Sequence, residues 1–336
     1  AIAWILRGDQ QVAPIRNDVL DITERDFKIR RPASEGPSLS YEQDLTPVVH
    51  LLRGVSIGIA LSGGAAHGMA HLGVLQAFDE AGITIDRMAG TSAGVLTGVV
   101  YAAGYSPQWC AQRFTEDLEP GKIYKWFPKG DGLYVLEKYR TGSWDRMLRK
   151  YLHEWQLEQL SIPISTITTD LISASQVVRT TGDAVHSILE SINLPVIAPP
   201  IARDGMLLVD GGIVNNLPAD LLDEQNCNCV IGVDVAAHIE QRVGNSTPET
   251  PASEMDIPGA VSTMLRCLRV QAHNLGSVGA EPADVMIAPD VSMYDATAFT
   301  KTMEMTEIGY NTAMEMLPEI KKYLHRLDKK LYPASS

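Results

Sequence analysis

The chain centres on the pentapeptide Gly-Thr-Ser-Ala-Gly at residues 90–94, here called the elbow, whose serine could act as a nucleophile. A short approach over residues 83–89 precedes it and an apolar run follows it, so the pattern predicts a strand, a sharp turn and a buried helix. In such a turn the hydroxyl of Ser92 is exposed at the strand tip, and Gly90 and Gly94 lack the Cβ atoms that would clash there. The positive end of the helix would face the charge that develops in acyl transfer.

A second candidate is Asp210, in the turn Asp-Gly-Gly that Gly211 and Gly212 complete. It follows an expected strand over residues 206–209, and α/β sheets place active sites at the carboxyl ends of their strands. An ordinary aspartate, with a pKa of ~3.9, is a weak base at neutral pH. Partial burial would therefore help Asp210 to accept the serine proton. The alternative is a plain Asp-Gly turn.

A glycine-rich segment at residues 62–68, here called the glycine loop, follows an apolar strand over residues 55–61 and precedes a helix over 69–81 that Gly82 ends. It lacks both the Gly-x-Gly-x-x-Gly spacing and the lysine of a phosphate-binding loop. Its backbone N–H groups could hold an oxyanion instead, and one such donor is worth ~3–4 kcal/mol of barrier. Close packing of helix on strand is the alternative.

A histidine to complete a triad is hard to place. The chain order Ser, Asp, His would need His238, His273 or His325, and of these only His238 follows an expected strand. His67 and His71 lie near the glycine loop and are interpreted as surface or packing residues. A Ser–Asp dyad fits the sequence better than a triad.

These motifs together resemble those of patatin-like phospholipases. They are Gly-Ile-Ala-Leu-Ser-Gly-Gly-Ala-Ala-His-Gly at 58–68, the elbow at 90–94, Thr-Asp-Leu at 169–171 and Val-Asp-Gly-Gly-Ile-Val-Asn-Asn-Leu-Pro at 209–218. Their order and spacing cover roughly residues 54–325 and are most similar to the bacterial branch related to neuropathy target esterase. The resemblance implies a three-layer α/β fold, with a mostly parallel central sheet and helices on both faces, and it implies neither a cofactor nor a metal.

The resemblance also implies roles for single residues. Ser92 would be the nucleophile and Asp210 its base. The oxyanion hole would be formed by Gly63, Gly64 and Ala65. One departure is His67, which stands before Gly68 where the family usually has arginine. Since arginine is a permanent bidentate donor and histidine is not, this chain is expected to be slower, more pH-dependent or differently selective, but not inactive.

The favoured function is a serine esterase that hydrolyses carboxylic esters of lipids, as a lysophospholipase or phospholipase A. A triacylglycerol lipase and a thioesterase remain open as substrate alternatives. Two other classes also remain open. One is a catalytically weak or inactive domain that binds a lipid or an effector on the same fold, and the other is a nucleotide-binding module built on the glycine loop.

Composition limits the partners and the location. Of 336 residues, 45% are hydrophobic, enough for a sizeable core. The formal net charge of −13 argues against nucleic-acid binding and against simple electrostatic docking on anionic lipid. Four cysteines without disulfide or zinc spacing favour reduced thiols and a cytoplasmic location. Residues 88–112 carry no charge, but glycines interrupt them, which predicts a buried central helix rather than a membrane span.

Three segments are expected. Residues 1–53 form an N-terminal extension or linker with a short helix near 40–52, residues 54–327 form the hydrolase domain and residues 328–336 a C-terminal tail. Relatives of the neuropathy-target type often carry cyclic-nucleotide-binding-like domains upstream, and the extension is too short for one. An upstream regulatory domain is therefore expected only if the chain is a fragment.

Two stretches are expected to set substrate preference. Residues 109–155, here called the aromatic segment, are either a helical layer packed on the sheet or a cap over an acyl channel. The second is a polar, proline-rich loop at residues 244–256. Transient, peripheral membrane contact is expected through Trp126 and Phe127 of the aromatic segment.

Overall fold

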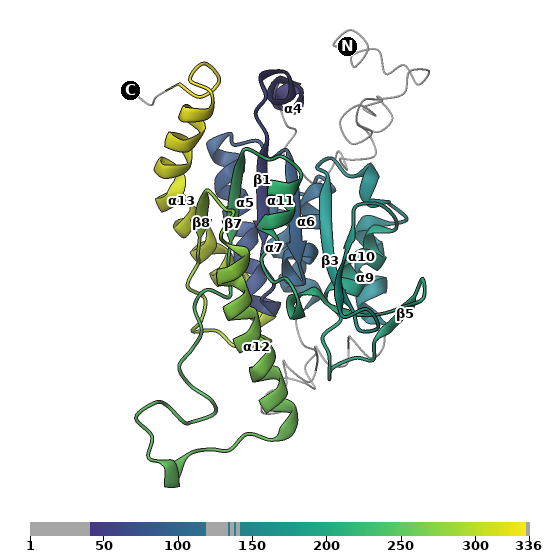
Figure 1. Cartoon of the computed structure of the whole chain (residues 1–336), viewed down its shortest axis with the longest axis vertical. Coiled ribbons are helices and arrows are strands. Elements are labelled where there is room, and N and C mark those ends of the chain that lie inside the picture. The colour runs from purple at the N-terminus through teal and green to yellow at the C-terminus, as the bar shows by residue number, and fades with distance from the viewer. Residues whose placement is uncertain (1–40, 119–133, 135–137, 139–141, 334–336) are drawn as a thin grey trace.

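A single mixed β-sheet forms the centre of the computed structural model, which describes residues 41–118, 134, 138 and 142–333 (Figure 1). Its strands are β1 (Ile57–Leu61), β2 (Arg87–Thr91), β3 (Ile164–Asp170), β4 (Ser175–Arg179), β5 (Ile201–Arg203), β6 (Met206–Asp210), β7 (Cys229–Val233) and β8 (Val285–Ile287). Their order is β5-β6-β3-β2-β1-β7-β8, with β4 also paired to β3. Five strands run parallel, whereas β4 and β6 run antiparallel to β3, and β5 antiparallel to β6.

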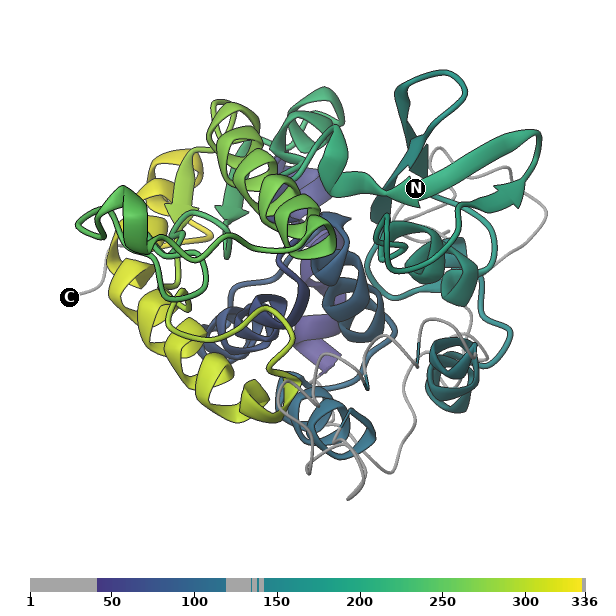
Figure 2. The ribbon, with the colours of Figure 1, turned by 90° about the horizontal axis from the view of Figure 1, so that it is seen from below.

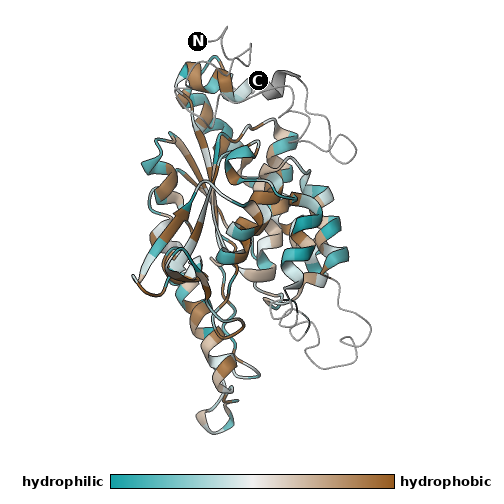
Figure 3. Cartoon of the chain, turned by 90° about the vertical axis from the view of Figure 1, so that its right-hand side faces the viewer, coloured by the Kyte–Doolittle hydropathy of each residue, from teal (hydrophilic) through white to brown (hydrophobic). Residues whose placement is uncertain are grey.

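Helices cover both faces of this sheet, which Figure 3 shows nearly edge-on. The α-helices of the described residues are α4 (Tyr41–Arg53), α5 (Ala70–Ala81), α6 (Ala93–Ala102), α7 (Pro107–Asp117), α9 (Ser143–Leu152), α10 (Ala184–Ser191), α11 (Ala219–Glu224), α12 (Ala260–Gly279) and α13 (Thr302–Leu327), of which α4 lies beyond one end of the strands. The larger core lies between the sheet and α5, α6, α7, α9, α10 and α13, and the smaller core lies under α11. The prediction of a three-layer α/β fold with a mostly parallel sheet is confirmed.

The sequence of β1 explains why its two faces differ. Ile57, Ile59 and Leu61 point into the larger core, while Ala60 belongs to the core under α11. Gly58 lies on this second face, and a Cβ there would be 2.9 Å from the Cys227 sulfur. Small residues on that face therefore let α11 and its neighbours approach the strand closely.

Most predicted elements are confirmed, with small shifts. The helix expected over 69–81 is α5, which a 3-10 turn over Ala65–Met69 precedes and Gly82 ends in the left-handed conformation. Two elements, β5 and α11, were not predicted from the sequence. Each is short, at three and six residues, so neither repeats its hydrophobic period often enough to be recognised.

The described part of the aromatic segment is a packed helical layer. Trp109 of α7 stacks on Tyr105 with ring centroids 4.2 Å apart and meets Tyr151 of α9 edge-on at 5.1 Å. Trp144 is buried in the larger core. The two residues expected to touch a membrane, Trp126 and Phe127, lie outside the described residues.

The two expected end segments lie against each other. The predicted short helix is confirmed as α4, whose His50 contacts Asp86 at 2.8 Å and Tyr332 at 2.7 Å. Arg53 forms an ion pair with Asp328. The divisions after residues 53 and 327 remain predictions, and these contacts cross both of them.

Other parts of the chain follow the expectations. Residues 244–256 contain a 3-10 turn and neither a strand nor an α-helix.

The uncharged stretch 88–112 forms β2, the elbow, α6 and the start of α7, and it is largely buried, as predicted. No helix in the described ranges is both long enough and apolar enough to cross a membrane. All four cysteines are free.

Candidate active site

The elbow connects β2 to α6 with the backbone of Ser92 at φ 51° and ψ −117°. This conformation costs a non-glycine residue of the order of 1–3 kcal/mol and is typical of functional sites. A Cβ on Gly94 would lie 2.1 Å from the Leu61 carbonyl oxygen, and one on Gly90 would lie 2.9 Å from the carbonyl carbon of Gly94. Both flanking positions therefore require glycine, as the sequence predicted.

The structure brings Ser92 and Asp210 together although 118 positions separate them. Ser92 Oγ donates a hydrogen bond of 2.6 Å to Asp210 Oδ2. The sheet creates this contact, because β3 pairs with β2 through Ile167–Thr91 and with β6 through Thr168–Asp210.

The backbone around Asp210 fixes its carboxylate. Asp210 Oδ1 accepts the Gly212 N–H at 2.8 Å, and the Asp210 carbonyl accepts the Thr169 hydroxyl at 2.9 Å. A Cβ on Gly211 would lie 2.4 Å from the Ile167 carbonyl oxygen, so the turn packs directly on β3. One carboxylate oxygen is thus held by the turn and the other is left for Ser92.

Burial makes the Asp210 carboxylate a stronger base. Asp210 is only 4% exposed. Burial raises the pKa of Asp210 to about 6, against the opposing effect of hydrogen bonds from Ser92 and Gly212. A carboxylate with a pKa near the working pH is a stronger base than an ordinary aspartate and is still ionised at pH 7.

The glycine loop packs closely against Ser92. A Cβ on Gly63 would be 3.1 Å from the Ser92 Cβ. The Gly63 N–H is not free, because it donates to the Asn216 carbonyl at 3.1 Å. The N–H groups of Gly64 and Ala65 have no acceptor among the described residues. Of the three residues predicted for an oxyanion hole, these two therefore have available donors.

His67 and Gly68 hold this loop in place. His67 is buried and its Nε2 lies 2.8 Å from the Tyr294 carbonyl, so the neutral ring donates a hydrogen bond there. Burial lowers the pKa of His67, which keeps the ring uncharged at neutral pH. A Cβ on Gly68 would lie 2.3 Å from the Ala93 Cβ, so the loop packs against the start of α6. His67 thus connects the loop to the segment after β8 as a neutral donor.

The described histidines do not complete a triad. None forms a hydrogen bond with Ser92 or Asp210 in the part of the chain that the structure describes. His273 contacts the Ala236 carbonyl and His325 the Tyr332 carbonyl, both through Nδ1. The interpretation of His71 as a packing residue is confirmed, since it is fully buried with Nε2 at 2.9 Å from the Ser62 carbonyl.

Two residues of the site had no role in the sequence analysis. Ser191, at the end of α10, accepts the backbone N–H of Ser92 at 2.8 Å. Asn216 holds Gly63 from both sides, because its carbonyl accepts the Gly63 N–H and its Nδ2 donates to the Gly63 carbonyl at 3.3 Å. Asn216 lies in the quoted motif at 209–218, which was the signal available for it. Ser191 lies in none of the quoted motifs.

The fold and this pair of side chains define a class of protein, in which a serine on a strand-to-helix elbow contacts a buried carboxylate at the carboxyl edge of an α/β sheet. A family model described as patatin-like phospholipase matches residues 59–223. The chain therefore carries a patatin-like phospholipase domain and belongs to that family.

Several relatives with established names are similar to this chain. Neuropathy target esterase sws of Drosophila melanogaster is 30% identical over 80% of this chain and 20% of its own length. Lysophospholipase NTE1 of Kluyveromyces lactis is 28% identical over 84% and 20%. Patatin-like phospholipase domain-containing protein 6 of Mus musculus is 33% identical over 59% and 15%. The chain spans a fifth or less of the length of these relatives.

Proposed function

We propose that this chain is a serine hydrolase of carboxylic esters in lipids, with lysophospholipids as its favoured substrates. The observation that carries the proposal is the 2.6 Å hydrogen bond from Ser92 Oγ to a buried Asp210 at the tip of a strained elbow. The names of the relatives, which include an esterase and a lysophospholipase, support the substrate class.

The geometry supports a two-step mechanism. In the first step Ser92 Oγ attacks the ester carbonyl carbon and its proton passes to Asp210, while the N–H groups of Gly64 and Ala65 receive the oxyanion. The intermediate collapses, the alcohol leaves with the proton from Asp210, and an acyl-Ser92 ester remains. In the second step Asp210 takes a proton from water, the hydroxide attacks the acyl group, and Ser92 regains its proton as the fatty acid leaves.

Product analysis tests the substrate class. We expect fatty acid release from 1-acyl-lysophosphatidylcholine to exceed release from a triacylglycerol or an acyl thioester of the same chain length. Faster cleavage of the triacylglycerol or the thioester would overturn the preference for lysophospholipids. It would leave the serine hydrolase proposal intact.

The activity is expected to depend on pH through Asp210. Because burial raises the pKa of Asp210 to about 6, the base is ionised above pH 6 and protonated below it. With a soluble p-nitrophenyl ester, kcat/KM should fall about tenfold per pH unit below 6 and level off above 7. A folded enzyme whose kcat/KM stays flat down to pH 4.5 would contradict Asp210 as the base.

Displacing the loop amides is expected to slow the reaction. In Gly64→Ala the new Cβ would lie 2.5 Å from a methyl of Val235, so the loop must shift. We expect kcat to fall about 10²-fold, the effect of losing one oxyanion donor. Gly259→Ala is the matched control, because a Cβ there meets nothing within 4 Å. Equal kcat values for the two variants would argue against this loop as the oxyanion hole.

Membrane contact is proposed at the edge where the parallel strands end, which Figure 2 views from below. Segments that leave this edge carry exposed apolar side chains, and Ile257 is 88% exposed, Met293 70% and Ile172 65%. These three residues lie in segments that follow the carboxyl ends of β7, β8 and β3, respectively. This contact would be transient and peripheral, on the cytoplasmic side, and would deliver lipid to the site.

One substitution tests this contact. Ile257→Asp is expected to weaken binding to phosphatidylcholine vesicles severalfold, because it removes a large apolar side chain from the interface. Hydrolysis of a soluble short-chain ester should not change. Leu52→Asp is the control, since Leu52 is 56% exposed on α4 at the opposite end of the molecule. Unchanged flotation of the Ile257→Asp variant with vesicles would count against the proposal.

A further inference from the structure

The hydroxyl of Ser191 lies between the end of β2 and the adjacent strand β3, where a direct backbone hydrogen bond between the two strands would otherwise form. Between β2 and β3, the Met88 N–H donates to the Pro163 carbonyl at 2.9 Å, and such bonds recur at every second residue of a parallel ladder. Four residues further along both strands, the corresponding pair is the Ser92 N–H and the Ile167 carbonyl. That pair would be the next direct bond of the ladder at the elbow.

This direct bond is replaced by a bridge. The Ser92 N–H donates to Ser191 Oγ at 2.8 Å, and Ser191 Oγ donates to the Ile167 carbonyl at 2.5 Å. Ser191 is fully buried. One hydroxyl thus satisfies a donor and an acceptor that would be costly to leave unpaired, and it keeps them apart. Because the Ser92 N–H and the Ile167 carbonyl are held apart, the backbone of the elbow can turn away from β3 at Ser92.

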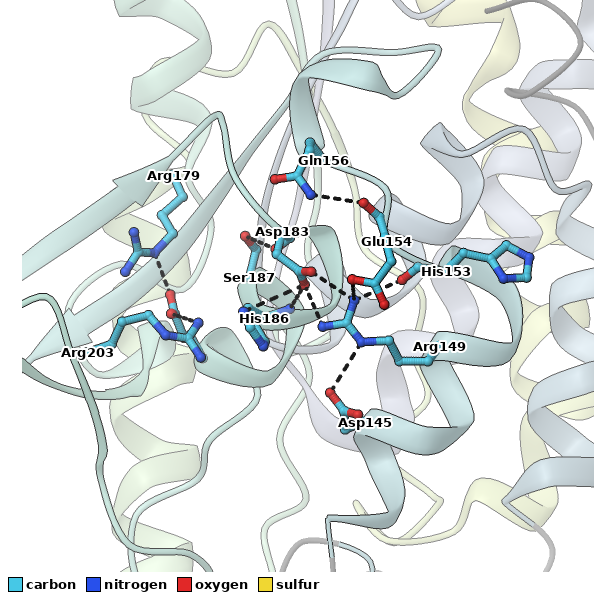
Figure 4. A network of polar contacts seen from close by, with 11 residues as sticks. Asp145, Arg149, His153, Glu154, Gln156, Arg179, Asp183, His186, Ser187 and Arg203 are labelled. Carbon is cyan, nitrogen blue, oxygen red and sulfur yellow. Dashed lines mark hydrogen bonds and ion pairs between the residues drawn. The ribbon is translucent and has the colours of Figure 1, made fainter.

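The helix that carries Ser191 is fixed at both ends. At its C-terminal end, the fully buried Glu190 accepts bonds of 2.5 Å from Arg179 of β4 and from Arg203 of β5. At its N-terminal end, Arg149 of α9 pairs with Asp183 through two bonds of 2.8 and 3.1 Å (Figure 4). A buried carboxylate held by two guanidinium groups leaves α10 little freedom to shift, so Ser191 is a rigid support.

We propose that Ser191 is a positioning residue for Ser92, a role that rests on the proposed hydrolase function. Its hydroxyl holds the elbow off the β2–β3 ladder and thereby keeps Ser92 Oγ at hydrogen-bonding distance from Asp210. Without this hydroxyl, the Ser92 N–H can pair with the Ile167 carbonyl by moving toward it. That movement takes the nucleophile away from its base.

The rate at which a small fluorophosphonate labels Ser92 measures this position. In Ser191→Ala we expect the second-order rate per folded molecule to fall 10- to 100-fold. Ser187→Ala is the matched control, because Ser187 is also a buried serine of α10 but its hydroxyl bonds to the Asp183 carbonyl within its own helix. Ser187→Ala should label within twofold of wild type. Equal rates for Ser191→Ala and wild type, or equal losses in the two variants, would overturn the proposal.

Two further readouts separate positioning from general stability. Ser191→Thr retains a hydroxyl and should label faster than Ser191→Ala. In Ser191→Ala the acid limb of kcat/KM should also move to higher pH, because a weaker bond from Ser92 no longer lowers the pKa of Asp210. If Ser191→Ala does not fold, Ser191→Val replaces it, because valine has the shape of threonine without a hydroxyl, and labelling at the wild-type rate would again refute the role. Absence of labelling in wild type would instead refute the hydrolase function itself.

Discussion

Replacing Ser92 by alanine is expected to reduce ester hydrolysis at least 10⁴-fold, since loss of a nucleophile typically costs up to about 10⁶ in kcat. Ser92 Oγ is the hydroxyl that donates to Asp210, and no histidine of the described residues forms a hydrogen bond with either of them. The measurement is kcat with a soluble ester and with lysophosphatidylcholine, together with thermal unfolding to show that the variant is folded.

Ser187→Ala controls for the loss of a buried hydroxyl outside the site. It should keep kcat within twofold. A Ser92→Ala variant that retains more than a tenth of the wild-type kcat would mean that another group attacks the ester. The elbow would then serve a different purpose, such as binding a lipid without cleaving it.

Asp210→Asn is expected to lower kcat 10³- to 10⁵-fold while it stabilises the fold at neutral pH. The raised pKa of Asp210, about 6 in the folded chain, means that the ionised carboxylate is less favourable there than in the unfolded chain. A shift of this size corresponds to about 2–3 kcal/mol at pH 8. The cost disappears below the ordinary pKa of aspartate, where both states are protonated. The gain in melting temperature should therefore be larger at pH 8 than at pH 5.

Asp170→Asn should show the opposite dependence on pH. The Asp170 carboxylate accepts hydrogen bonds from Ser173 and from the backbone N–H groups of Leu207 and Ile172, which hold its pKa below the ordinary value. Its stabilising effect is present above the unfolded pKa and is lost as the pH falls through the folded pKa. Asp170→Asn should thus destabilise the protein, and more at pH 7 than at pH 3. Equal pH profiles for the two variants would contradict the assignment of a raised pKa to Asp210.

The fold and the two central residues could be predicted because their signals are local. The backbone of one turn requires glycine at positions 90 and 94. In β1, the alternation of large and small residues indicates which face of the strand packs against which core. Asp210 was expected near Ser92 because active sites lie at the carboxyl ends of the strands in α/β sheets. In the structure β6 runs antiparallel to β3, and its last residue, Asp210, pairs with Thr168 next to the end of β2. Burial was also expected to make Asp210 a better base, and the raised pKa of Asp210 agrees.

The parts that the sequence did not reveal depend on contacts between distant segments. Gly63 resembles its neighbours in the glycine loop, yet its N–H is taken by Asn216, 153 positions away. Ser191 is an ordinary helical serine until β2 and β3 place the elbow against it. His67 likewise acquires its partner, the Tyr294 carbonyl, only from the segment after β8. The spacing of residues along the chain does not predict such contacts.

The most direct test of the central claim is intact mass after treatment with a fluorophosphonate, applied in parallel to wild type, Ser92→Ala and Asp210→Asn. We expect one adduct on wild type, mapped to Ser92 by peptide analysis, none on Ser92→Ala and much slower labelling of Asp210→Asn. A folded wild-type protein that gains no adduct, or an adduct that persists in Ser92→Ala, would contradict the Ser92–Asp210 hydrolase. The first result would favour a lipid- or effector-binding domain on the same fold.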